Sequence, residues 1–109
     1  MIEAAPRFLD DVERILSRLS HELGPGGHKI EITPDRRTEL RAGVVRVPES
    51  SLQHWLRFHT LPTMLVRDLA YLAKQASLAR EGWSGPGAEA DAHAFAEQFL
   101  RRVSLQDTD

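Results

Sequence analysis

The chain contains no cysteine among its 109 residues. This absence excludes disulfide bonds, thiolate zinc sites and a cysteine nucleophile, although it does not fix the cellular compartment. No apolar run approaches the roughly 18 residues that a membrane-spanning helix needs. The acidic start MIEAAPRFLDD also lacks the apolar core of a secretion signal. We therefore expect a cytoplasmic protein that does not enter a membrane.

Neither acidic nor basic residues are in large excess, and the formal net charge is -2. The basic residues at 36–37 and 101–102 form short spots and not a stripe, so we expect no nucleic-acid partner. The glycine-rich stretches GPGG and GWSGPG lack the Lys-Ser/Thr ending of a phosphate-binding loop. No G-x-S-x-G motif of a hydrolase nucleophile is present either.

Hydrophobic spacing predicts an α+β fold. The segment 6–23 carries apolar residues at helical intervals, and 28–33 and 40–47 read as strands, with Gly43 marking a bulge or a bend. Three helices then follow: one opened by Ser50 and Gln53 as a capping box, one from Pro62 to about Arg80, and one over 87–104. We expect an N-terminal amphipathic helix, a small two- to three-stranded sheet and three helices packed on it. They would form a single domain over 1–109, with 1–5 and 105–109 frayed.

The first predicted helix ends in His-Glu-Leu-Gly, which is how many zinc helices of metallopeptidases begin. A zinc helix needs a second histidine four residues after the first, so that both side chains reach one ion. Pro25 occupies that position after His21, and 24–27 cannot continue a helix. We interpret this stretch as a helix C-terminus, with His21 near the negative end of the helix dipole.

A second stretch, FHTLPTMLVRDLAYLAK over 58–74, resembles the zinc helix of small zincins of the ImmA/IrrE type. That family helix has a Thr-Leu start followed by His-Glu-Leu-Ala-His, and the corresponding residues here are Arg67, Asp68, Leu69, Ala70 and Tyr71. The stretch GAEADAHAFAEQFL over 87–100 is similar to the helix that supplies the family's third, acidic ligand. Glu89 matches that ligand. The family order of leading helix, small sheet, zinc helix and ligand helix also matches.

This resemblance implies a scaffold that has lost its metal. Arg67 and Tyr71 stand where the two histidines would be, and Asp68 stands in the place of the general-base glutamate. A guanidinium has no lone pair for zinc. Such a protein would be a pseudo-enzyme, in which an Arg67–Glu89 or a Tyr71–Glu89 pair replaces the metal links. The alternative is that Arg67 and Glu89 are solvated charges and Tyr71 is an aromatic residue at the core edge.

Two further sets of residues are candidates. An unusual zinc site could be built from His21, His28, Glu89 and His93, although helical spacing turns His93 toward solvent. Trp55 and Trp83 are candidate partner contacts, and Trp83 lies in a Gly/Pro loop, where it either plugs the core or anchors an interface.

The sequence therefore favours a non-catalytic interaction or regulatory domain on a zincin-like scaffold, with a protein partner and no cofactor. A homo-oligomer stays open. The alternative is a small zinc-dependent hydrolase with a non-standard His/Glu site. A nucleic-acid-binding regulator is the least favoured reading, because of the charge.

Overall fold

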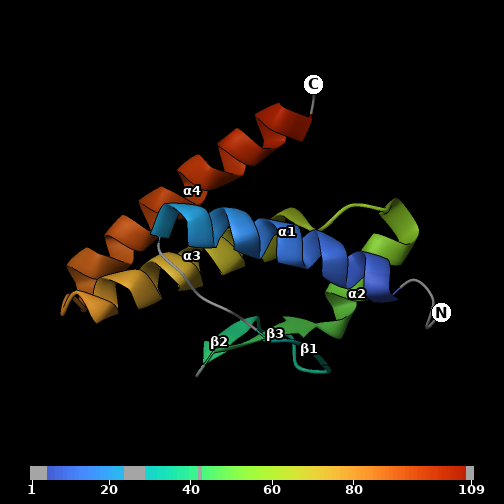
Figure 1. The fold of residues 1–109 in the computed structure, drawn as a ribbon, viewed down its shortest axis with the longest axis horizontal. Helices are drawn as coiled ribbons and strands as arrows, with labels where there is room; N and C mark the ends of the chain where they lie inside the picture. Colours follow the sequence, from blue (N-terminus) through green and yellow to red (C-terminus); the bar gives the residue numbers. More distant parts are fainter. Residues whose placement is uncertain (1–4, 24–28, 42, 108–109) are drawn as a thin grey trace.

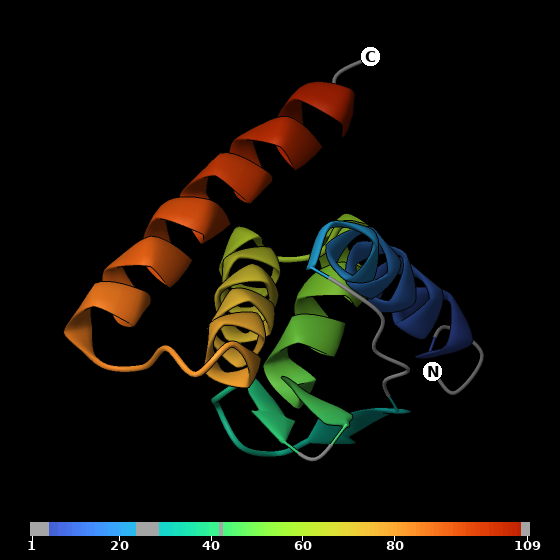
Figure 2. The same ribbon diagram turned by 60° about the vertical axis from the view of Figure 1, so that its left-hand side comes forward.

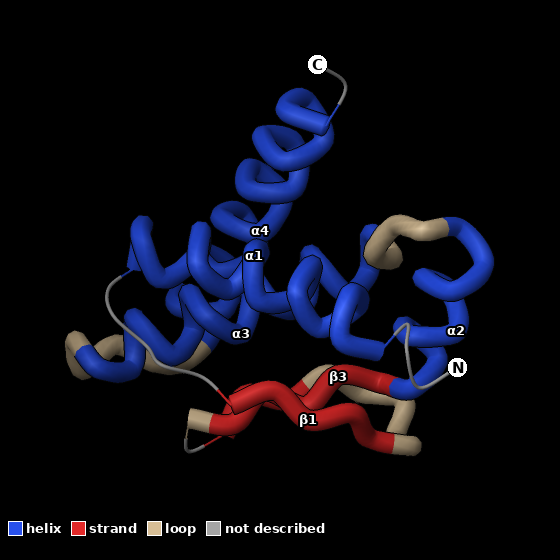
Figure 3. Tube along the Cα trace, turned by 45° about the vertical axis from the view of Figure 1, so that its right-hand side comes forward, coloured by secondary structure: helices blue, strands red, loops and turns tan. Residues whose placement is uncertain are grey.

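The computed structural model describes residues 5–23, 29–41 and 43–107, which form a helix, a small sheet and three further helices (Figures 1 and 3). The elements are α1 (Ala5–Leu23), β1 (Lys29–Thr33), β2 (Glu39–Arg41), β3 (Val44–Pro48), α2 (Glu49–Phe58), α3 (Thr63–Arg80) and α4 (Pro86–Asp107). The predicted α+β architecture is confirmed. No helix among these residues is long and apolar enough to cross a membrane.

Helix α1 lies across α3 and buries the apolar face that its sequence predicts (Figure 1). Phe8, Val12 and Leu19 are almost fully buried, while Asp10 and Arg14 between them are exposed. Its last residue is Leu23, directly before the predicted Gly-Pro stop. Packing of this face holds the N-terminal segment to the body, because burial of an apolar side chain contributes about 1.5–3 kcal/mol.

The sheet has the strand order β1-β3-β2, with β1 parallel and β2 antiparallel to β3. The single strand predicted over 40–47 is wrong. The chain divides at Gly43, whose φ of 77° allows a reversal that a residue with a side chain would resist. Val45 and Val47 face the core and are fully buried. On the outer face Arg46 contacts Glu31 at 3.5 Å and Glu39 at 3.9 Å, so a ladder of opposite charges covers it.

Helices α2 and α3 both begin directly after a proline. Pro48 and Pro62 are the N-cap residues, and neither helix has a hydrogen bond from a capping side chain. The capping box predicted from Ser50 and Gln53 is therefore wrong, because Pro48 ends β3 and α2 begins at Glu49. Among the described residues, the first backbone N–H groups of both helices therefore have no capping side chain as acceptor.

Helix α4 packs antiparallel against α3 after a short loop, and its C-terminal end stands clear of the sheet (Figure 2). The loop closes α3 with a Schellman arrangement: Gly82 has a φ of 85°, and the Trp83 N–H donates to the Leu78 carbonyl at 2.9 Å. The buried face of α4 begins with small residues and ends with larger ones: Ala88, Ala92, Ala96, Phe99 and Val103. The alanines allow α4 to approach α3 closely.

Candidate functional site

Arg67 and Tyr71, which the zincin resemblance aligns with two histidine ligands, both face α4. Arg67 Nε lies 3.0 Å from Glu97 Oε1, and one turn later the Tyr71 and His93 rings lie 4.4 Å apart, centroid to centroid. Lys74 and Asp91 make a third link at 3.9 Å. We call this row the α3–α4 seam, which consists of Arg67, Tyr71, Lys74, Asp91, His93 and Glu97.

The expected pairing of Glu89 with Arg67 or Tyr71 is not formed. In the antiparallel register Arg67 meets Glu97 and Tyr71 meets His93, so Glu89 lies one helical turn short of the nearer partner. The Glu89 side chain is exposed and has no hydrogen bond or ion pair with any residue that the structure describes. Arg67 and Glu97 are each about half exposed, so this ion pair contributes at most about 1 kcal/mol.

The histidines and glutamate proposed for an unusual zinc site do not come together in the described residues. His21 is exposed at the end of α1, where neighbouring Glu22 contacts Arg102 of α4 at 2.7 Å. Arg102 lies nine residues after His93, roughly 13 Å along the helix axis. His28 falls outside the described residues. Within 5–23, 29–41 and 43–107, no group of three acidic or histidine side chains is arranged to hold a metal ion.

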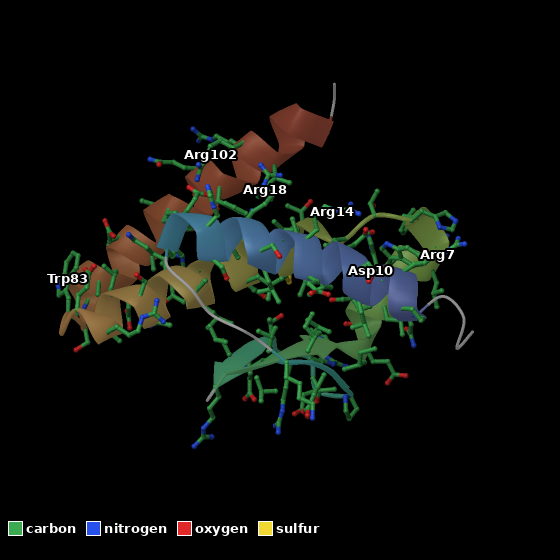
Figure 4. All side chains as sticks on the ribbon, viewed as in Figure 1. Arg7, Asp10, Arg14, Arg18, Trp83 and Arg102 are labelled. Atoms are coloured by element: carbon green, nitrogen blue, oxygen red, sulfur yellow. The ribbon has the colours of Figure 1, made fainter. Side chains whose placement is uncertain are left out.

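The two tryptophans have different surroundings. Trp55 is only 8% exposed, its ring packs edge-on against Phe8, and its Nε1 donates to Asp11 Oδ2 at 2.7 Å. This burial contradicts Trp55 as a partner contact. Trp83 is 46% exposed and lies at the α3–α4 loop, far from the start of α1 (Figure 4). Of the two alternatives for Trp83, a plug of the core is therefore excluded, and its indole lies near Gly87.

Arginines gather along the outer side of α1 and on the C-terminal half of α4 (Figure 4). Arg14 contacts Asp11 at 3.4 Å, and Arg102 contacts Glu22 at 2.7 Å. Because acidic side chains are interspersed among them, this face has a mixed charge and offers no uniform field to a charged ligand.

A pocket of about 230 Å³ opens where the turn between β1 and β2 meets the first turns of α2 and α3. We call it the α2–α3 pocket. Of the residues proposed for a functional site from the sequence, only Asp68 lies here. Its polar lining consists of Arg36, Thr38, Ser50, Ser51, His54 and Asp68. The other five lining residues were not predicted from the sequence. The sequence feature that could have indicated them is the proline directly before each of α2 and α3, which lack a capping side chain.

Ser51 is the buried polar residue of this pocket. It is 7% exposed, and its hydroxyl has no hydrogen-bond partner among the residues that the structure describes. A buried polar group without a partner costs about 1–3 kcal/mol. Ser51 therefore lines the pocket and has an unused hydrogen-bonding capacity there.

Asp68 enters the same pocket from the second turn of α3. Burial raises the pKa of the Asp68 carboxyl above its ordinary value of 3.8, and the neighbouring Arg67 guanidinium opposes this increase. Ser51, His54 and Asp68 are the residue types of a hydrolase triad. In the described part of the chain, however, no hydrogen bond connects any two of them. The hydrogen bond that joins the nucleophile to its base in such a triad is therefore not formed between Ser51 and His54.

The rim of the pocket is apolar and exposed. Met64 lines the opening and is 69% exposed, and Phe58 is 55% exposed. The Phe58 ring lies 4.7 Å from the His54 ring, centroid to centroid, so this apolar surface is continuous with the pocket. Two of the four exposed large apolar side chains of the described residues therefore flank one opening.

Comparisons with protein-family models, with curated proteins and with solved structures found no significant match.

Proposed function

We propose that this chain is a non-catalytic interaction domain with a regulatory role, which binds a protein partner through the α2–α3 pocket and its rim. The observation that carries the proposal is the exposure of Met64 and Phe58 beside a pocket with a buried serine, which has no hydrogen-bond partner in the described part of the chain. Methionine and aromatic residues are enriched at protein interfaces, where they act as anchors.

The size of the pocket favours a side chain of a protein over a free small molecule. Small-molecule sites typically have volumes of about 300–1,000 Å³ and enclose most of the ligand. The α2–α3 pocket has about 230 Å³ and is open to solvent. One side chain of a partner could enter it, while the apolar rim would cover the partner surface around that side chain.

The zincin-like origin of the scaffold remains part of the proposal. Two observations support a scaffold without a catalytic metal. Arg67 forms an ion pair with Glu97, and the Tyr71 ring packs at a tilt against the His93 ring. A guanidinium cannot serve as a zinc ligand, so these two positions would connect α3 to α4 where a zincin connects its helices through zinc. No observation favours the hydrolase alternative.

Site-specific photo-crosslinking in the cells that express the protein tests the proposal. A photoreactive phenylalanine analogue replaces Met64 in one variant, Trp83 in a second and Glu13, an exposed position on α1, in a third. We expect one discrete protein adduct from position 64, and no such adduct from position 83 or 13. A Phe58→Glu change should abolish the adduct from position 64, because it places a charge on the apolar rim.

Three results would count against this surface. An adduct from position 83 alone would move the interface to the α3–α4 loop. Equal labelling from positions 64 and 13 would indicate nonspecific contact. An adduct from position 64 that persists with Phe58→Glu would show that the rim does not make the contact.

A further inference from the structure

The α2–α3 pocket collects the positive ends of two helices. Ser50 and Ser51 lie in the first turn of α2, and Met64 and Leu65 in the first turn of α3, and all four line the pocket. Neither helix is capped by a side chain. Unpaired N–H groups and the helix dipole together favour a negative group at such a terminus. Both helices exceed eight residues, but the Leu65 N–H of α3 already donates to the Pro62 carbonyl at 3.0 Å, so it is mainly α2 that has N–H groups available to a ligand.

The buried Ser51 hydroxyl is an independent observation that points to a ligand. It is more than nine-tenths buried, lines the pocket and has no partner among the described residues. Native proteins rarely leave a buried hydroxyl unpaired, and ordered water, an ion or a ligand completes its bonding. A ligand oxygen in the pocket would do so.

The charges around the pocket indicate the sign of that ligand. Arg36 lines it from the β1–β2 turn and makes no ion pair with any described residue. His54 and Asp68 are the other titratable groups that line it. Burial raises the pKa of the Asp68 carboxyl above its ordinary value, but the ionised carboxylate would repel an anion. Arg36 is therefore the group that supplies positive charge to the pocket, and the N-terminal turn of α2 and the Ser51 hydroxyl supply further donors.

We propose that the α2–α3 pocket binds an anionic oxygen group, carboxylate or phosphoryl, carried by a side chain of the protein partner. The first-turn N–H groups of α2, the Ser51 hydroxyl and the Arg36 guanidinium hold the oxygens, and Met64 and Phe58 contact the apolar surface around the charged residue. This inference rests on the proposed function, since it names the group that the partner inserts.

A titration of the isolated protein followed by amide NMR tests this chemistry without the partner. Sodium acetate and inorganic phosphate serve as the two probes at pH 7 and constant ionic strength. We expect saturable shifts of the Glu49, Ser50 and Ser51 amides with at least one probe. Acetate alone would identify a carboxylate as the partner group, and phosphate alone would identify a phosphoryl group.

Matched variants separate a built site from general attraction to positive charge. Arg36→Gln should raise the dissociation constant about tenfold, as expected for loss of a charge-assisted hydrogen bond. Arg37→Gln is the control, because Arg37 is the adjacent exposed arginine and does not line the pocket. Ser51→Ala should also weaken binding. Asp68→Asn should strengthen it, because the substitution removes a negative charge and adds an amide donor.

The inference fails if the α2 amides do not shift with either probe. It fails equally if Arg36→Gln and Arg37→Gln weaken binding to the same extent, which would indicate an adventitious ion only. Weaker anion binding in Asp68→Asn would contradict the charge argument, because removal of a negative charge should favour an anion. If these results occur while the adduct from position 64 persists, the proposed function stands and only the anionic group is wrong. If anion binding is present without that adduct, the protein partner is wrong.

Discussion

Replacement of Ser51 by alanine should stabilise the free protein, although it removes a group from the proposed binding site. The hydroxyl is buried and unpaired among the described residues, and such a group costs about 1–3 kcal/mol. Alanine also has a helix propensity higher by about 0.5 kcal/mol. Loss of the contacts of one oxygen atom offsets part of this gain. We expect a net increase of about 1–2 kcal/mol in the free energy of unfolding.

Urea unfolding followed by circular dichroism measures this change, with thermal unfolding as a second readout. Each kcal/mol corresponds to an increase of about 4–8 °C in Tm for a domain near this size. Ser50→Ala is the matched control. Ser50 is also in the first turn of α2 and lines the pocket, but it is exposed, so its hydroxyl already reaches water. The control should change stability by only about 0.5 kcal/mol.

Destabilisation of Ser51→Ala relative to Ser50→Ala would refute the reasoning, because it would mean that the Ser51 hydroxyl forms a bond in the free protein. The expected combination of higher stability with weaker anion binding is the trade-off typical of functional sites. A residue that only completes the core would not show it, since its removal lowers stability.

Two further predictions concern residues that the structure places in the core and at the pocket. Trp55→Phe should lower the free energy of unfolding by about 2–4 kcal/mol, because it removes the bond to Asp11 and part of a buried ring. Its effect should be less than additive with Asp11→Ala in a double-mutant cycle, and strict additivity would contradict the bond. Below its ordinary pKa of 3.8, Asp68 is protonated in both the folded and the unfolded protein, and its contribution to stability is then fully present. This contribution is lost as the pH rises through the raised pKa of Asp68 in the folded state. Asp68→Asn should therefore be more stable than the wild type at pH 7, and the difference should disappear below about pH 3.8; a difference independent of pH would exclude burial of the charged form as its cause.

Local patterns in the sequence predicted most of the secondary structure. Apolar residues at helical spacing located α1, and its end at Leu23 follows from the Gly-Pro pair that cannot continue a helix. Alternation located β1, and three helices follow the sheet as expected. The prediction failed where one residue changes the chain direction: Gly43 divides the expected strand in two. A local pattern also does not show which of two adjacent residues begins a helix: α2 begins at Glu49, whereas the sequence pointed to Ser50 as the start.

The candidate site depends on distances between residues of different helices, and spacing along the sequence does not give these distances. The resemblance pointed to Glu89 opposite Arg67 and Tyr71, but the alanine face of α4 sets a register that brings Glu97 and His93 there instead. The sequence places Glu89, His93 and Glu97 on successive turns of α4. Only the packing of α3 against α4 decides which of them meets a given partner.

The sequence by itself determined the elements, their order and the absence of cysteine chemistry, because helical and strand periodicity and residue identity are local properties. Tertiary structure decided that Trp55 is buried and Trp83 exposed, and that Ser51, Arg36 and Asp68 share one pocket. These residues come from three segments. Their proximity arises from the way the sheet and the first turns of α2 and α3 pack together, and burial of the Ser51 hydroxyl is a consequence of that packing.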